Sequence, residues 1–375
     1  MERMRWLAVV AVVSAAIVSL PASAAARSTA PKARSAAFYL GVAQQGLADV
    51  QKGWGGAPGG WYYDTYNRQP PSMPLARLWS AFPLFEAFIG VAIAQPTAAN
   101  KAALKAYADR AARLYWNPYV KPWGGYDWYP NYATSTGVLY FDDSGWWGLA
   151  FVDAYKVTGK TAYLDDARRA LQFIVGTGWD PKYGGTWWDT KHSHKTIEPL
   201  AAATLIATRL YEAQHRPSDL YWAQKLLTWA NLHSFNRGRG LYQRSATDDT
   251  VMDYVQGLMI VSNWELCHVL HRAALCTKAK QLANASVTAF PRALDWSPQF
   301  DVVYLRWMLE YGKDAGDPRW YNLAAYNAER ALANGRNGSG FFENRWDGTV
   351  IGDGLAHEAA NLELFAWLAA TAPGT

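Results

Sequence analysis

Apolar residues recur along most of the chain at the three- and four-residue spacing of α-helices, and glycine, proline and polar clusters interrupt them. Two kinds of helix alternate. The segment 142–158 is apolar nearly all round, which predicts a helix buried on every side, whereas 161–176 keeps its apolar residues on one stripe, which predicts an outer helix with a solvated face. The predicted helices are 34–51, 76–95, 101–116, 142–158, 161–176, 198–213, 218–234, 254–273, 277–289, 299–314, 317–334 and 356–371.

The connections between these segments alternate in length as well. Long linkers such as 117–141 and 177–197 lead from an outer to an inner helix, and short ones lead back. Five long linkers share a glycine–aromatic motif, for example Gly-Gly-Thr-Trp-Trp at 184–188, which recurs at about 55–65 residues with one longer gap. Six helical hairpins in a ring predict an all-α (α/α)6 barrel in a single domain, 27–375. Its active face should lie where the long linkers gather, at the N-terminal ends of the inner helices.

Composition narrows the class of protein. Half of the 375 residues are hydrophobic and 18% are charged, which excludes a disordered chain. The net charge is +5 without any basic run, so we expect no nucleic-acid partner and no stable membrane insertion. The chain holds 20 Trp, 22 Tyr and 13 Phe, more aromatic residues than a core needs. This excess predicts a surface on which sugars stack.

The N-terminus has the pattern of an export signal. Arg3 and Arg5 precede an apolar stretch, Trp6 to Leu20, and alanine-rich cleavage sites follow it. The stretch is short for a membrane span, so we expect a signal peptide over 1–26, with an uncleaved anchor as the alternative. The mature protein is then secreted, either extracellular or associated with the cell wall. Cys267 and Cys276 fit an oxidising compartment as a disulfide, the alternative being two buried thiols.

The first candidates for chemistry are Asp142 and Asp143, at the start of the fourth predicted helix. Glycoside cleavage needs two carboxyl groups, about 5–5.5 Å apart for retention of configuration and about 6.5–9.5 Å for inversion. Neighbouring side chains in the first turn of a helix can reach the shorter distance. The competing interpretation is a helix cap followed by a favourable first-turn charge. Periodicity alone does not choose this pair over the other carboxyl groups at the active end: Asp64, Glu198, Asp248, Asp249, Asp253, Asp301 and Glu358.

A resemblance favours the pair. The segment 140–150, Tyr-Phe-Asp-Asp-Ser-Gly-Trp-Trp-Gly-Leu-Ala, followed by Ala-Tyr-Lys-Val-Thr-Gly at 154–159, resembles the signature of glycoside hydrolase family 76. That family contains secreted α-1,6-mannanases on an (α/α)6 barrel. The resemblance implies Asp142 as nucleophile and Asp143 as acid/base. The chain departs from the family at 191–198, where members often carry an Asn-rich segment, and at Val255, where they often carry Asn.

Aromatic and polar side chains on the linkers and helix starts are candidates for substrate contacts. Their alternative role is to pack onto the glycine turns and hold the linkers still, and Trp146 and Trp147 cannot both face a cleft, because adjacent helix positions diverge. His192 and His194 lie in a solvated loop without the further ligands of a metal site. The candidate substrate-binding residues are Trp61, Trp123, Tyr126, Trp146, Trp147, Trp187, Trp188, Tyr254 and Gln256.

The sequence therefore predicts a secreted endo-acting glycosidase that cuts α-1,6-linked mannose chains, as a monomer and without metal or cofactor. Fungal mannan and the mannan cores of actinobacterial lipoglycans are the substrates that the resemblance implies. Transglycosylation is a close alternative. A sugar epimerase or polysaccharide lyase on the same barrel would instead depend on proton transfer, for example through His194 and His357. A third alternative is a carbohydrate-binding protein without turnover.

Overall fold

A computed structural model describes residues 33–66, 74–132, 137–352 and 354–374. Residues 32–375 form one compact unit. The expected signal peptide, 1–26, lies outside the described residues. Within the described part of the chain, no helix is long and apolar enough to cross a membrane.

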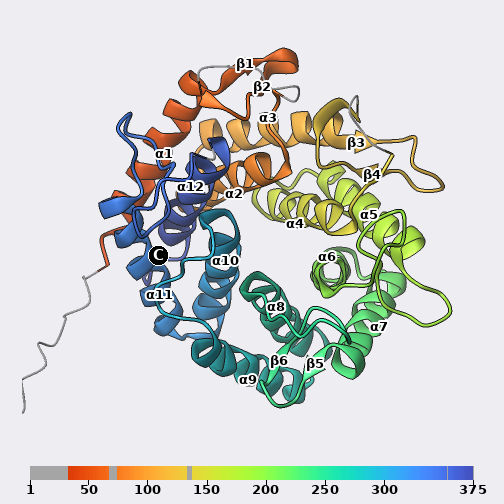
Figure 1. The fold of residues 1–375 in the computed structure, drawn as a ribbon. Coiled ribbons are helices and arrows are strands. Elements are labelled where there is room, and N and C mark those ends of the chain that lie inside the picture. Colours follow the sequence, from red (N-terminus) through yellow and green to blue (C-terminus); the bar gives the residue numbers. More distant parts are fainter. Residues whose placement is uncertain (1–32, 67–73, 133–136, 353, 375) are drawn as a thin grey trace, which may run out of the picture. The chain divides into compact units, whose positions relative to one another are not determined.

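Twelve α-helices in the described residues form two concentric rings, as Figure 1 shows. Neighbouring inner helices pack side by side, and α12 closes the ring against α2. The inner helices are α2 (Leu78–Ala94), α4 (Phe141–Thr158), α6 (Ile197–Gln214), α8 (Asp253–Leu270), α10 (Pro298–Ala315) and α12 (Leu355–Ala370). The outer helices are α1 (Ala36–Gly53), α3 (Ala98–Tyr115), α5 (Ala162–Phe173), α7 (Pro217–His233), α9 (Ala273–Ala289) and α11 (Pro318–Asn334). The predicted all-α barrel and its alternation of inner and outer helices are confirmed.

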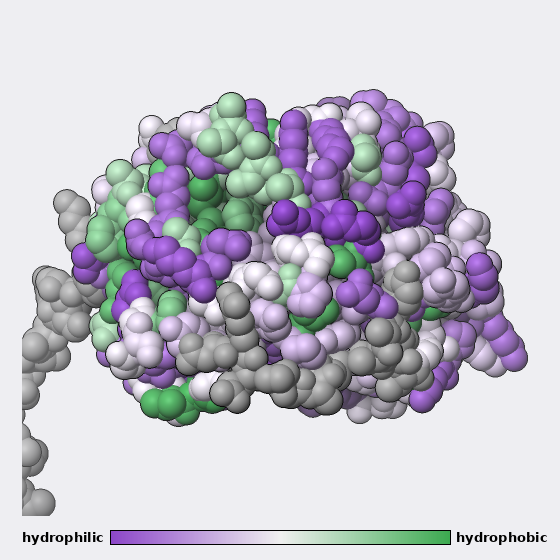
Figure 2. All heavy atoms as spheres, turned by 90° about the horizontal axis from the view of Figure 1, so that it is seen from above, coloured by the Kyte–Doolittle hydropathy of each residue, from purple (hydrophilic) through white to green (hydrophobic). Residues whose placement is uncertain are grey.

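Burial follows the two patterns read from the sequence. Nearly every residue of α4 from Phe141 to Ala154 is buried, whereas α5 and α11 bury one stripe each. On the face of the molecule that Figure 2 shows, hydrophilic residues cover much of the surface, with apolar patches between them. The outer helices therefore separate the apolar inner ring from water.

Three two-stranded antiparallel hairpins lie in the long linkers. They pair β1 (Gly55–Ala57) with β2 (Trp61–Tyr62), β3 (Trp116–Asn117) with β4 (Gly125–Tyr126), and β5 (Phe235–Asn236) with β6 (Leu241–Tyr242). The glycines of the recurring motif allow tight turns and close packing. Gly184 and Gly185 both have positive φ, and a Cβ at either position would lie 2.6 Å from the indole of Trp229.

A buried ionic network joins the inner helices inside the barrel. The Arg209 guanidinium of α6 contacts Asp153 of α4 at 2.7 Å, Glu265 of α8 at 2.6 Å and Glu310 of α10 at 2.5 Å. Arg306 of α10 binds Asp153 and, at 2.6 Å, Glu310. Both guanidiniums are almost fully excluded from water. Arg306 also contacts Glu86 of α2 at 3.3 Å, so the network ties α4, whose first turn holds the paired aspartates, to four of the other inner helices.

Cys267, near the end of α8, and Cys276, in α9, form a disulfide with a Cα–Cα distance of 5.3 Å. The disulfide closes the short turn between an inner helix and the following outer helix. The predicted pairing is confirmed, and the alternative of two free thiols is not.

Candidate active site

Asp142 and Asp143 occupy the first turn of α4 at the mouth of the barrel, which we define as the opening at the N-terminal ends of the inner helices. Tyr140 is extended, and the helix begins at the next residue, Phe141, whose N–H donates to the carbonyl oxygen of Trp188 at 2.9 Å. Asp142 is partly exposed and Asp143 is buried. The Oδ1 of Asp142 is buried and has no hydrogen-bond partner among the described residues.

The two carboxyl groups have unequal environments. Burial raises the pKa of Asp142 to about 6, while the Trp188 side chain, backbone N–H groups of the helix start and Arg244 oppose that rise. Burial raises the pKa of Asp143 well above its ordinary value, and the neighbouring charges of Asp142 and Asp127 raise it further. Every stabilising group acts on the charge of Asp142 and none on that of Asp143. At neutral pH the pair therefore holds one anion and one acid.

The segment 186–197 brings Trp188 against the pair. Trp188 donates its backbone N–H to the carbonyl of His194 at 2.9 Å, and its ring lies 4.8 Å from that of Tyr140 and 4.9 Å from that of His194. The neighbouring Trp187 stacks on His192, with ring centres 5.1 Å apart. Both tryptophans are partly exposed at the mouth, as the sequence predicts for residues that can contact a sugar.

A third carboxyl group faces the pair from α6. Glu198 is buried, and burial together with the charge of Asp142 raises its pKa to about 7. Arg244 binds Glu198 at 3.0 Å, and Thr196 donates its hydroxyl to the same carboxylate. Arg244 thus offsets negative charge at both Glu198 and Asp142, a role that sequence reasoning did not predict for this linker residue.

Aromatic rings from four inner helices cluster at the mouth end of the barrel, although Trp146 is fully buried and Tyr254 is almost fully buried. Tyr254 lies 5.8 Å from the ring of Trp146 and 6.1 Å from that of Phe300, while Trp79 lies 4.8 Å from Phe300. A cavity of about 300 Å³ opens next to Trp79 and Phe300 and is also lined by Trp128. Sequence reasoning identified Tyr254 and Trp146 but missed the other three. Their positions at helix starts, or in the linker before one, were the available signal.

Four further predicted substrate contacts lie in the core, as the fully buried Trp146 does. Trp61 donates its indole N–H to Tyr115 at 3.1 Å, and Trp147 faces α3 and donates to the carbonyl of Asp127 at 3.3 Å. Tyr126 is buried, with its hydroxyl on Asp166 at 3.0 Å, and Gln256 bonds the backbone of Tyr242 through its amide N–H and oxygen. Because these side chains are fully or almost fully covered, the packing role replaces the cleft role for all four. Trp123 is 48% exposed and packs over Gly176 at the end of α5, away from the aspartates.

The competing carboxyl groups have other environments. Asp249 is an exposed partner of Arg239. Asp64 is satisfied by the Arg77 and Ser80 side chains, and Glu358 accepts the backbone N–H of Phe342 at 2.6 Å on the side of α12 that faces α1. Asp253 and Asp301, at the starts of α8 and α10, lie near each other, and burial raises the pKa of both. Asp142 and Asp143 differ from all of these in being adjacent, unpaired with any cation by a salt bridge among the described residues, and beside aromatic rings of the mouth.

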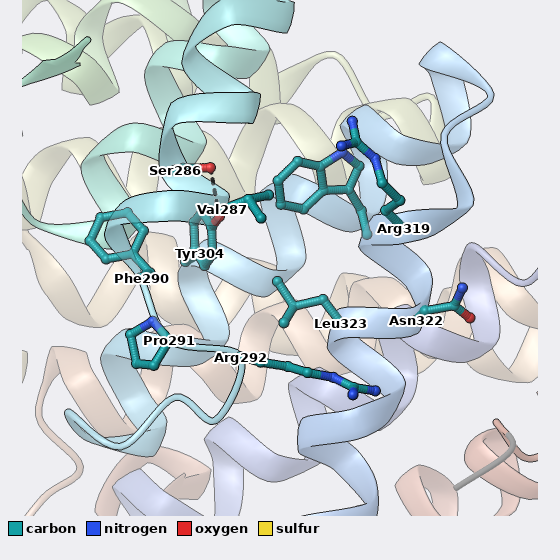
Figure 3. A pocket seen from close by; sticks show the side chains of 10 residues that line it. Ser286, Val287, Phe290, Pro291, Arg292, Tyr304, Arg319, Asn322 and Leu323 are labelled. Atoms are coloured by element: carbon teal, nitrogen blue, oxygen red, sulfur yellow. Dashed lines mark hydrogen bonds between the residues drawn. The ribbon is translucent and has the colours of Figure 1, made fainter. Parts of the chain in front are cut away.

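A cavity on the outer wall lacks this chemistry. It has a volume of about 320 Å³ and lies between α9 and α11, over Tyr304 of α10, and Figure 3 shows its apolar lining. The Tyr304 hydroxyl meets that of Ser286 at 2.9 Å, and none of the residues that line this cavity is a carboxylate. No group of three or more His, Cys, Asp or Glu in the described residues is arranged to hold a metal ion.

Comparison with solved structures gives the same barrel. A family 76 α-mannanase from Bacteroides thetaiotaomicron superposes with a TM-score of 0.77 at 20% identity, over 88% of this chain and 95% of that one. An inactive variant of an α-1,6-mannanase from a Salegentibacter species, in complex with α-1,6-mannotriose, superposes with a TM-score of 0.68 at 16% identity, over 88% and 99%. Cellobiose 2-epimerase from Spirochaeta thermophila matches with a TM-score of 0.61 at 12% identity, over 88% and 98%. Identities this low establish the fold only.

Sequence comparison identifies the family. The search of curated proteins finds no match. The model of glycosyl hydrolase family 76 matches residues 62–298, which include the paired aspartates and four of the six inner helices complete. Because this match covers more than half of the chain, the resemblance seen in the sequence is confirmed: the protein belongs to glycosyl hydrolase family 76 and is a glycoside hydrolase.

Proposed function

We propose that the protein is an endo-acting α-1,6-mannanase that works outside the cytoplasm and retains the configuration of the sugar, with Asp142 as nucleophile and Asp143 as acid/base. The observation that carries the assignment of roles is the asymmetry of the pair. Hydrogen bonds and a nearby cation favour the anion at Asp142, whereas burial and neighbouring anions keep the proton on Asp143. The α-1,6-mannotriose bound to the Salegentibacter enzyme supports the choice of linkage.

Two steps follow from this arrangement. In the first, Asp143 gives its proton to the glycosidic oxygen while the Asp142 carboxylate forms a bond to the anomeric carbon and the leaving chain departs. In the second, Asp143 takes a proton from water, the water oxygen attacks the anomeric carbon, and Asp142 is released as the anion. If a sugar hydroxyl takes the place of water in the second step, the same residues carry out transglycosylation.

Export is supported by two features of the chain. The first residues have the basic, apolar and small-residue order of a signal peptide. The Cys267–Cys276 disulfide is of a kind that persists in oxidising compartments and is rare in the cytosol.

Digestion of linear α-1,6-mannan tests the activity. The mature protein should release a ladder of mannose oligomers, and Asp143→Asn should release none above the uncatalysed level. Asp249→Asn is the matched control, because this exposed carboxylate is bound to Arg239, and it should give the wild-type ladder. Cleavage of α-1,2- or α-1,3-mannan but not of the α-1,6-linked chain would overturn the linkage, and an active Asp143→Asn variant would overturn the site.

A further inference from the structure

A second hollow lies at the mouth end of the barrel, beyond the catalytic pair. We call it the rim cavity: it has a volume of about 380 Å³ and lies between the α5–α6 linker, the end of α7 and residues 244–248 of the α7–α8 linker. Its lining includes His194, Trp229, His233, Arg244 and Ala246. Because α7 runs antiparallel to the inner helices, its last turn reaches the mouth end, and this places Trp229 and His233 there.

Two residues connect the rim cavity to the catalytic pair. Arg244, which lines it, binds Glu198 at 3.0 Å and lowers the pKa of Asp142. His194, which also lines it, packs its ring 4.9 Å from Trp188, whose side chain bonds Asp142. One layer of side chains therefore separates the rim cavity from the mouth.

The lining of the rim cavity combines aromatic rings with polar side chains, as sites that bind sugars do. The Trp229 indole packs closely on the backbone of Gly184 and Gly185 and stacks with His233, with ring centres 4.6 Å apart. Aromatic rings offer an apolar surface to the C–H groups of a sugar, while the histidine and arginine donors suit its hydroxyl groups. Trp229 is already packed against these two glycines without a ligand, which lowers the cost of ordering it on binding.

The charged side chains of the lining favour a neutral ligand. Lys195 is bound to Asp180 at 2.6 Å, and Arg244 is bound to Glu198 and lies 3.7 Å from Asp248. Each cation of the lining is thus already matched by a carboxylate, so the rim cavity offers no unmatched positive charge to a phosphate or carboxylate.

Further exposed aromatic rings continue from the rim cavity along the outside of α7. Trp229 lies 6.4 Å from Trp179, which lies 5.8 Å from Trp222, and Tyr183 and Tyr221 are 68% and 54% exposed. These rings form a row on the outer wall, and Lys225 lies over three of them, at 4.7–5.1 Å from the ring centres. The row accounts for part of the aromatic excess in the composition.

We propose that the rim cavity is a distal glycan subsite, which binds one neutral sugar unit of a chain, or of its side branch, whose other units occupy the mouth. The proposal rests on the proposed function for the nature of the chain. The rim cavity makes the enzyme prefer long or branched glycans over short ones, because only these reach both sites at once.

Filling the rim cavity tests the proposal. Ala246→Trp places an indole in it from an exposed position that makes no side-chain hydrogen bond, and Leu232→Trp, on the exposed side of α7, is the matched control. We expect Ala246→Trp to lower kcat/KM on long α-1,6-mannan roughly tenfold, and to leave kcat/KM on α-1,6-mannotriose within about twofold. Leu232→Trp should leave both unchanged. An equal effect of Ala246→Trp on both substrates, or none, would overturn the proposal.

Binding separates this proposal from the proposed function. Electrophoresis through gels that contain soluble mannan, glucan or xylan measures retardation without turnover. If the wild type cleaves no mannan, the proposed function fails. A glycan subsite would still be supported if a polysaccharide gel retards the wild type and Leu232→Trp but does not retard Ala246→Trp. Equal retardation of all three proteins, or of none in any gel, would contradict it.

Discussion

Replacing Arg209 by methionine tests whether the ionic network holds the inner ring together. The guanidinium is fully buried and contacts three carboxylates on three helices, at 2.7 Å, 2.6 Å and 2.5 Å. Methionine retains most of the apolar volume but leaves these carboxylates without that cation. Breaking a buried ion pair by removing one partner costs about 3–5 kcal/mol, because the remaining charge is uncompensated.

The pKa of one partner gives an independent magnitude. Burial alone would raise the pKa of Glu310, but Arg209 and Arg306 outweigh it and lower the pKa from 4.5 to about 2. One pKa unit corresponds to about 1.4 kcal/mol, so this difference stabilises the folded state by roughly 3 kcal/mol at neutral pH. Because the folded pKa is depressed, the contribution is complete above pH 4.5 and is lost as the pH falls toward 2. It should be less than about half as large at pH 3.

Urea unfolding at pH 7 measures the effect. Arg209→Met should lower the free energy of unfolding by about 3 kcal/mol, and the difference from wild type should shrink below pH 4. Arg113→Met, at an exposed position of α3, should change it by no more than about 0.5 kcal/mol. If Arg209→Met lowers the free energy of unfolding by less than about 1 kcal/mol, or by an amount that stays constant down to pH 3, the ionic network does not stabilise the inner ring in this way.

Three further predictions concern the site and the disulfide. Arg244→Met removes a cation that lowers the pKa of Asp142, so the acid limb of the kcat/KM–pH profile, near pH 6 in the wild type, should move to higher pH; an unchanged limb would exclude this role. Trp188→Phe removes a hydrogen bond to the same carboxylate. It should therefore also move the acid limb to higher pH, and it should lower kcat, in the same pH series. Cys276→Ser opens a loop with a sequence separation of 9 from Cys267 and should cost about 2–3 kcal/mol in urea unfolding, whereas a stability equal to that of the oxidised wild type would contradict this.

The barrel could be predicted from the sequence because its signal is local. Hydrophobic periodicity distinguishes an all-buried helix such as α4 from a one-sided helix such as α5 without knowledge of the neighbours. Alternating linker lengths then fix the order of the two rings. The predicted start of α4 at Asp142 differs by one residue from the observed start at Phe141, because the helix begins where the backbone of Tyr140 stops being extended.

The aromatic lining of the site could not be predicted in the same way. Trp61 and Trp188 both follow a Gly-Gly pair in a long linker, yet the first is buried against Tyr115 and the second is partly exposed beside Asp142. Which outcome occurs depends on whether the next outer helix covers the ring, and that contact is distant in sequence. Trp79 and Phe300 reach the mouth from α2 and α10, so their proximity follows only from closure of the ring.

Azide rescue distinguishes the proposed roles of Asp142 as nucleophile and Asp143 as acid/base. With an α-mannobiosyl fluoride, which needs no acid to leave, azide should attack the glycosyl-enzyme of Asp143→Asn and give the α-azide. In Asp142→Asn, no covalent intermediate can form, so azide should enter directly and give the β-azide. We expect NMR to identify the α-azide as the product of Asp143→Asn and the β-azide as the product of Asp142→Asn. The reverse order would exchange the roles. Normal hydrolysis of mannan by both variants would remove the catalytic centre from the start of α4.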